Sequence, residues 1–290
     1  MTLNYEYLCN DNWQHIMSYC YIGDQISVMR TCRKFYNDLY IYDLDLNMYH
    51  NNNDDAFRMN CLLSNDILEQ KKYKKLISLC ISVNYEITDL NYLTYLKKLR
   101  LMNTPLITNE SIKELVNVEH LELKFNHEIS NLNHMTKLKY LHLDNISSIR
   151  NKGISKLMNM ESLNLESCTK ISYLNHMTKL KELILHSISL LSNEGINKLT
   201  NIEHLSIMNN KRIADINNMN KIKKLYLYNC NINNNGIRNI NPHILQMINP
   251  KITNIDHFTD LKKLCVAYSD SCNPGLRTYY ENMIEKINKT

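Results

Sequence analysis

The chain has 290 residues, of which 44% are apolar and 22% charged, a composition that excludes a disordered chain and fits a globular one. Its 34 Lys and Arg against 29 Asp and Glu give a net charge of +5, spread along the sequence without a basic run, so we expect no nucleic-acid partner. The sequence shows neither a basic and apolar leader nor a stretch of membrane-spanning length, and we expect a soluble cytoplasmic protein without membrane contact.

The cysteine and histidine patterns argue against a catalytic or redox role. Nine cysteines, an odd number, include no C-x-x-C pair, which predicts reduced thiols. The eleven histidines form no H-E-x-x-H motif, and neither a Gly-rich phosphate loop nor G-x-S-x-G occurs. We therefore expect a chain that is not an enzyme and needs no cofactor.

The first segment with a clear pattern is residues 8–40, LCNDNWQHIMSYCYIGDQISVMRTCRKFYNDLY, where apolar residues recur at helical spacing. Trp13, Ile16 and Met17 fall at i, i+3 and i+4, and Asp24 is a suitable N-cap for a following helix. The pattern predicts three short helices. A module of this size has little core of its own and is expected to lean on another surface.

This segment resembles an F-box, the helical module that docks a Skp1-type adaptor of cullin-RING ubiquitin ligases. The residues that match the family pattern, in order, are Leu8, Asp11, Trp13, Ile16, Met17, Tyr19, Asp24, Ile26, Met29, Cys32, Arg33, Phe35 and Tyr36. Cys9 stands where Pro is usual, and Asn12 where an aliphatic residue is common. The resemblance implies an F-box-like module over residues 1–40 that contacts the adaptor through Leu8, Trp13, Ile16, Met17, Ile26 and Met29. The alternative is that the same helices only cap the first repeat.

Residues 41–75 are predicted to be a linker that contains an atypical first repeat. Leu44 and Leu46 alternate as in a short strand, and a polar stretch follows at 51–55. The amphipathic segment NDILEQKKYKKL then leads into a regular pattern.

Residues 76–272 carry a ladder of L-x-L pairs at steps that alternate mainly between 20 and 22 residues. The octapeptide LNHMTKLK therefore returns unchanged after 42 residues, at 132–139 and 174–181. Alternation places both apolar residues of a pair on one side of a short strand, and stacking the strands in parallel joins them into one core. The pairs are Leu79/Ile81, Leu99/Leu101, Leu121/Leu123, Leu141/Leu143, Leu163/Leu165, Leu183/Leu185, Leu205/Ile207, Leu225/Leu227, Leu245/Met247 and Leu264/Val266.

Three residues after each pair lies a small polar position, expected to hydrogen-bond the backbone of the adjacent coil. It is occupied by Asn84, Thr104, Asn126, Cys168, Asn210 and Cys230, whereas Ile146, Ile188 and Pro250 depart from the pattern. The repeat resembles the leucine-rich-repeat signature L-x-x-L-x-L-x-x-N/C-x-L. It predicts an α/β fold, a solenoid with parallel strands on the concave face and short helices or 3₁₀ turns on the convex face. The whole chain is similar to F-box and leucine-rich-repeat proteins, including repeat families of large DNA viruses such as insect poxviruses and giant viruses.

The arms that return from one strand to the next are of two kinds. Long coils carry NESIKELVN, NKGISKLMN, NEGINKLTN and NNGIRNI, in which the leading Asn is expected to cap a short helix. Short coils such as LNHMTKLKYL fit a 3₁₀ or single-turn connection. Residues 273–290 are predicted to form a helix that covers the open edge of the last coil.

The residues between and beside the paired Leu point away from the core, so they define the expected binding surface. We expect target contacts from Arg100, His120, Glu122, Tyr140, His142, Asp144, Asn164, Glu166, Tyr226 and Tyr228. Tyr and His are typical contact residues, which favours a protein partner with a basic patch. The alternative is that this row is polar only because the strands must expose something to water.

Two hypotheses of function follow. The F-box resemblance implies a monomeric substrate receptor of a Skp1-cullin-F-box ubiquitin ligase, with the repeats holding an unidentified target. The alternative is a binding module without a ligase role, for example a viral decoy of a host protein. His120, Glu122, His142 and Asp144 lie on neighbouring predicted strands, but we expect no metal there because strand neighbours project in parallel.

Overall fold

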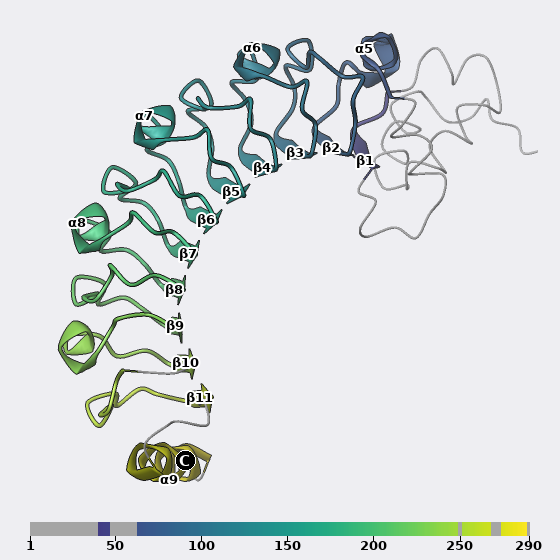
Figure 1. Cartoon of the computed structure of the whole chain (residues 1–290). Helices are drawn as coiled ribbons and strands as arrows, with labels where there is room; N and C mark the ends of the chain where they lie inside the picture. The colour runs from purple at the N-terminus through teal and green to yellow at the C-terminus, as the bar shows by residue number, and fades with distance from the viewer. Residues whose placement is uncertain (1–39, 47–62, 249–250, 268–273, 289–290) are drawn as a thin grey trace, which may run out of the picture. The chain divides into compact units, whose positions relative to one another are not determined.

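The computed structural model of the chain describes residues 40–46, 63–248, 251–267 and 274–288 (Figure 1). Residues 1–39 of the F-box-like module predicted over residues 1–40, with all its predicted adaptor contacts, lie outside the described residues. The chain divides into two compact units between Leu138 and Lys139, and each is described by itself. In the described part of the chain, no helix is long and apolar enough to cross a membrane.

The first unit contains four parallel strands in sequence order. The strands are β1 (Asp43–Leu46), β2 (Ser78–Ser82), β3 (Lys98–Met102) and β4 (His120–Lys124), and the short helices are α5 (Asn65–Leu68), the 3₁₀ helix η2 (Lys71–Tyr73) and α6 (Asn109–Ile112). The strands lie along one face of the unit, and the helices and turns lie along the other (Figure 1).

The second unit repeats this arrangement with seven parallel strands in sequence order. The strands are β5 (Tyr140–Asp144), β6 (Ser162–Glu166), β7 (Glu182–His186), β8 (His204–Met208), β9 (Lys224–Tyr228), β10 (Ile244–Ile248) and β11 (Lys263–Ala267). The helices are α7 (Asn151–Ile154), α8 (Asn193–Ile196), the 3₁₀ helix η3 (Asn234–Ile237) and α9 (Pro274–Asn288). The predicted leucine-rich-repeat solenoid is therefore confirmed, since each predicted L-x-L pair lies in a strand.

The core is built from the inward side chains of these strands. Leu163 pairs in register with Leu141 on one side and Leu183 on the other, and Leu183 pairs with Leu205. All four side chains are fully buried. Each coil thus buries its apolar face against the next coil, which no single coil does alone.

A ladder of small polar side chains satisfies the backbone inside the solenoid, as predicted. The Asn210 amide donates to the carbonyls of Ile188 and Leu191 at 2.6 and 3.1 Å, and its oxygen accepts from the N–H groups of Arg212 and Ile213, both at 2.9 Å. Cys168 uses its thiol in the same way, at 3.4 Å from the carbonyl of Leu143. These bonds tie each turn to the preceding coil and replace lost contacts with water.

A left-handed residue ends most strands, and its backbone N–H binds the next coil. Asn209, for example, has a φ of 55° and donates to the carbonyl of Tyr228 at 3.0 Å. Asn tolerates this conformation better than most residues, which explains its frequent use there. The residues with this conformation are Val83, Asn103, Phe125, Asn145, Ser167, Ser187, Asn209 and Asn229.

The predicted role of the leading Asn in the long coils is wrong in detail. Asn193 is the first residue of α8, and Ser192 is the N-cap. The Asn193 side chain instead accepts hydrogen bonds from the backbone N–H groups of Ala214 and Asp215 in the following coil, at 2.8 and 3.3 Å. The Asn side chain reaches past its own helix because the next coil presents backbone donors that would otherwise stay unbonded. Equivalent bonds are made by Asn65, Asn109, Asn151 and Asn234.

The glycines of the long coils allow a close backbone approach. A Cβ atom added at Gly195 would lie 2.3 Å from the carbonyl oxygen of Ser172, and one at Gly236 would lie 2.0 Å from that of Ala214. The carbonyl of Gly195 in turn accepts from the N–H of Leu174 at 2.8 Å. The missing side chain therefore lets neighbouring coils bond directly.

Helix α9 packs on β11 at the end of the second unit. Its Tyr280 is fully buried, and the hydroxyl donates to the carbonyl of Ile252 at 2.8 Å. Tyr279 donates to Asp256 and accepts from the N–H of Ile255, both at 2.9 Å. Buried aromatic area and satisfied hydroxyl groups together hold the helix on the last coil.

Candidate functional site

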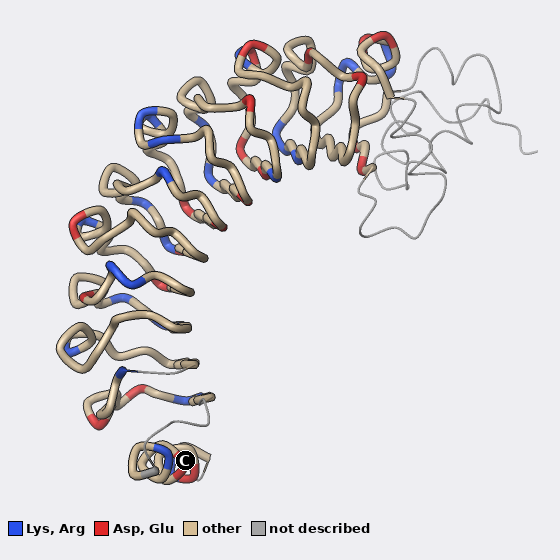
Figure 2. The backbone as a smooth tube through the Cα atoms, in the orientation of Figure 1, with Lys and Arg blue, Asp and Glu red and all other residues tan. Residues whose placement is uncertain are grey.

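The candidate surface is the outward side of the strands, which we call the strand face. It consists of the first, third and fifth residues of each strand, while the second and fourth are the buried pair. All ten residues expected to contact a target occupy such positions in β3 to β6 and β9. Lys and Arg are interspersed with Asp and Glu along both units (Figure 2).

In the first unit the strand face holds a three-residue ion-pair cluster. Glu122 lies directly opposite Arg100 in the strand register. Its Oε1 atom is 3.0 Å from Arg100 Nε and also 3.0 Å from His120 Nε2. Only 16% of the Glu122 side chain is exposed, so these contacts hold the carboxylate in one orientation.

In the second unit a denser polar cluster lies on β5 and β6. His142 Nε2 is 3.2 Å from Glu166 Oε1, and Asn164 Nδ2 donates to the same oxygen at 3.1 Å. Asp144 lies opposite Glu166 in the register, as His142 lies opposite Asn164. The strand face therefore brings two carboxylates and one imidazole together, with His142 only 9% exposed.

A second carboxylate and imidazole pair lies on β7 and β8. Glu182 Oε1 is 2.8 Å from His204 Nδ1, and the other oxygen accepts from the Ser162 hydroxyl at 2.6 Å. The His204 ring meets the Tyr226 ring edge to face, with 5.2 Å between centroids. Polar and aromatic contact groups are thus continuous from β6 to β9.

The sequence interpretation grouped His142 and Asp144 with two residues of the first unit and left out Glu166. It considered His142 and Asp144 together with His120 and Glu122, but His120 bonds Glu122 within the first unit, and Glu166 is the partner of His142 in the second. The signal was present in the spacing, because the 22-residue step from β5 to β6 places residues 144 and 166 side by side. Also missed on the strand face were Cys80, Ser162 and Ser206.

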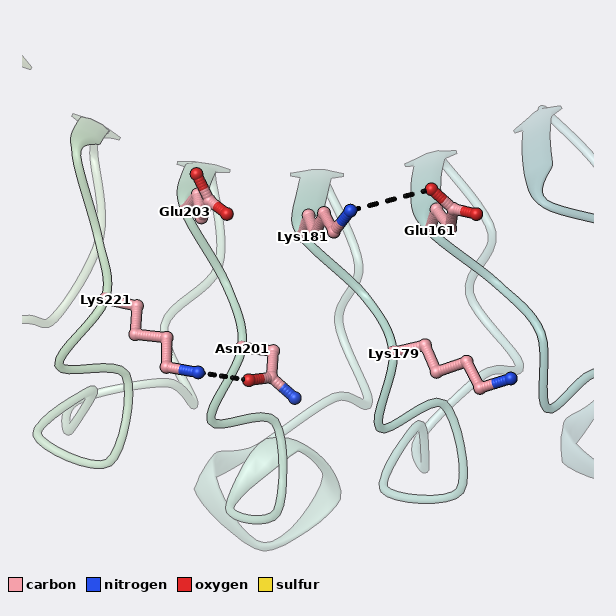
Figure 3. A pocket seen from close by; sticks show the side chains of 6 residues that line it. All are labelled: Glu161, Lys179, Lys181, Asn201, Glu203 and Lys221. Atoms are coloured by element: carbon pink, nitrogen blue, oxygen red, sulfur yellow. Dashed lines mark hydrogen bonds and ion pairs between the residues drawn. The ribbon is translucent and has the colours of Figure 1, made fainter.

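A groove on the side of the second unit is lined by charged residues (Figure 3). Its volume is about 370 Å³, and its lining consists of Glu161, Lys179, Lys181, Asn201, Glu203 and Lys221. Lys221 Nζ donates to Asn201 at 2.6 Å, and Lys181 Nζ lies 3.8 Å from Glu161. Exposed contacts of this kind are worth little individually, and side chains of both charges line the groove, so we assign it no ligand.

Among the cysteines of the described coils, Cys80, Cys168 and Cys230 are buried and Cys265 is exposed. Burial raises the pKa of the Cys168 thiol to about 11 and also raises that of Cys230. At Cys80, burial and the neighbouring Asp45 carboxylate raise the thiol pKa as well. Thiols held in the protonated form are poor nucleophiles, so the raised pKa values argue against a reactive role for Cys168 and Cys230.

Comparison with known proteins gives partial likenesses of fold. A scan of family models and a search of curated proteins found no match. Among solved structures, internalin C2 of Listeria monocytogenes is 26% identical, with 58% of this chain and 78% of that chain covered and a TM-score of 0.45. A leucine-rich-repeat protein of Leptospira interrogans is 17% identical, with 74% and 66% covered and a TM-score of 0.48. No property of either protein is carried over to this chain.

Proposed function

We propose that this chain is a non-catalytic protein-binding module whose strand face holds the partner. The observation that carries the proposal is the cluster on β5 to β9 of the second unit, where Glu, His and Tyr side chains are fixed by mutual contacts on a regular sheet. Side chains that are already ordered lose little entropy on binding. Rigid backbone strands also hold contact groups more accurately than loops do.

The charge of this surface selects the chemistry of the partner. Asp144, Glu166 and Glu182 lie on three consecutive strands, and His142 and His204 lie beside them. Tyr226 and Tyr228 add aromatic area on β9. A protein segment with Lys or Arg residues fits this surface. Its basic groups would pair with the carboxylates, and the aliphatic parts of its Lys and Arg side chains would pack on the tyrosine rings.

The experiment that tests the strand face is affinity capture from candidate host cells with matched charge reversals. Glu182→Lys changes the strand face, whereas Glu194→Lys makes the same change at an exposed position of helix α8. We expect proteins captured by the wild type to be retained by Glu194→Lys and lost by Glu182→Lys. If both variants capture the same proteins, or lose them equally while folded, the strand face is not the binding surface.

The finer proposal is a substrate receptor of a Skp1-cullin-F-box ubiquitin ligase that acts in the cytoplasm. Its support is the ordered match of residues 1–40 to the F-box pattern, including Trp13 and the Cys32-Arg33 pair. The strand face would then present a bound target to the ligase, and the chain itself would carry no catalytic group. Cys9 and Asn12 lie in the part of the pattern that meets the adaptor.

A pull-down of a Skp1-type adaptor tests the ligase role. The full chain is compared with a Trp13→Ala, Ile16→Asp variant and with a control that changes exposed apolar residues of the first unit, Tyr85→Ala and Leu106→Asp. Binding by the wild type and the control but not by the first variant supports the receptor. A folded wild type that binds no adaptor favours the alternative, a binding module without a ligase role such as a viral decoy.

A further inference from the structure

The cluster on β5 and β6 has the composition and spacing of a metal site. One ligand atom each from His142, Asp144 and Glu166 lies within 4.8 Å of the other two. Ligands of one Zn²⁺ ion, bound at about 2.0–2.2 Å, are separated by less than twice that bond length. The 3.2 Å between His142 Nε2 and Glu166 Oε1 already meets this requirement, and small side-chain rotations bring Asp144 into range.

The register explains why three ligands gather although strand neighbours project in parallel. Asp144 and His142 alternate along β5 on the strand face, and Glu166 lies directly opposite Asp144 on β6. The long Glu side chain bends back along β6 to reach His142, so the ligands come from a triangle of positions and not from one row. On the other side of Glu166, the register places a second imidazole, that of His186 on β7.

Two features of this cluster favour a cation. Carboxylates directly opposite one another on adjacent strands repel, and a divalent ion between them removes that repulsion. Asn164 supplies the second feature, because its Nδ2 bonds Glu166 at 3.1 Å and so places one end of the side-chain amide beside the cluster. The two ends of an amide are nearly equal in shape, so a half-turn of the side chain presents the oxygen to the same space.

We propose that His142, Asp144 and Glu166 form a binding site for a divalent transition-metal ion, Zn²⁺ being the best fit. Imidazole and carboxylate together suit Zn²⁺, whereas Mg²⁺ prefers oxygen ligands and keeps its water. His142 binds through Nε2, Glu166 through Oε1 and Asp144 through one carboxylate oxygen. Asn164 Oδ1 or a water molecule completes the coordination.

Titration of metal-stripped full-length chain with ZnCl₂, read by competition with a chromophoric chelator, tests this site. Glu166→Gln and Asp144→Asn each remove one ligand charge with almost no change in shape. Glu182→Gln is the matched control, since it removes an equal charge from the next strand, beside His204. We expect the two ligand variants to bind Zn²⁺ at least tenfold more weakly than the wild type, and the control to stay within twofold.

The nine cysteines of the chain are potential zinc ligands elsewhere, so only differences between variants are interpreted. Co²⁺ in place of Zn²⁺ provides a second readout, because its visible spectrum reports coordination and should change in His142→Gln. Mg²⁺ should not displace the bound ion. Equal affinity in the wild type and the ligand variants, an equal loss in Glu182→Gln, or no uptake by the wild type would each overturn the site. No partner protein is present, so the result is independent of the proposed function.

Discussion

The inward and outward side chains of the same strands follow different rules. On the inward side, Leu or Ile recurs in register from coil to coil, because each coil is buried against the next. On the outward side, consecutive strands β7, β8 and β9 present Ile184, Ser206 and Tyr226 at the same position. Packing therefore restricts which residues can face inward. The outward side chains meet solvent, so their identity can vary and they can form the binding surface.

Truncation of an inward residue should have the largest effect on stability. Leu163→Ala removes a fully buried side chain between two register partners. We expect a loss of about 2 to 5 kcal/mol in the free energy of unfolding, since a cavity remains in the close-packed core. Urea denaturation followed by circular dichroism measures it. A loss below about 1 kcal/mol would mean that the coils do not share one core.

Removal of a buried polar ladder residue should rank next. Asn210→Ala leaves two carbonyls and two N–H groups without their partner. The Asn210 side chain is fully buried, so bulk water does not reach these groups in the folded protein. We expect a loss of roughly 2 to 3 kcal/mol in the same denaturation experiment. Asn201→Ala is the control, because its hydrogen bonds lie at the solvent-exposed surface and water can replace them. Equal losses in the two variants would contradict the buried role of Asn210.

Gly195→Ala should show whether helix propensity or packing against the neighbouring coil has the larger effect on stability, because the two predict changes of opposite sign. Helix propensity alone predicts a gain of about 0.5 to 1 kcal/mol when Ala replaces Gly in α8. The close approach to the Ser172 carbonyl predicts a loss of about 1 to 3 kcal/mol, because the coils must move apart. Thermal unfolding decides between them, and a raised midpoint would show that the neighbouring coil shifts without cost.

Outward substitutions should change stability least. Tyr226→Ala and Glu122→Gln are expected to alter the free energy of unfolding by less than about 1 kcal/mol, since partly exposed contacts contribute little. Affinity for a partner identified by capture should nevertheless fall for Tyr226→Ala. A loss comparable to that of Leu163→Ala would show that the strand face is a structural surface.

Thiol reactivity compares an exposed cysteine of the second unit with two buried ones, and stability is not expected to change. Cys265 is exposed on β11, whereas Cys168 and Cys230 are buried with raised pKa values. At pH 8 a raised pKa leaves less thiolate, so iodoacetamide should modify Cys265 well before the other two. Peptide mapping by mass spectrometry follows the rates. Equal rates in the folded chain would contradict the burial of the ladder cysteines.

Much of the fold was readable from periodicity. The alternation of L-x-L pairs located strands β2 to β11, and Leu44 with Leu46 located β1. Local patterns were less informative for the long coils, where Asn193 looks like an N-cap but binds the next coil. An Asn side chain serves either purpose, and only the positions of neighbouring backbone groups select one.

The candidate site was predicted less completely. The sequence identified which residues face outward, because strand alternation is local. It did not pair His142 with Glu166, although the register between β5 and β6 brings them within 3.2 Å. The two residues are 24 positions apart in the chain, and their contact depends on how a long side chain bends across two strands.

The sequence by itself determined the repeat, the facing of each strand residue and the small polar ladder, since all three follow from spacing along one chain. The tertiary structure decided which Asn bonds which coil, why Gly195 has no side chain, and which carboxylate meets His142. These features depend on distances between coils, and such distances exist only after the coils have stacked.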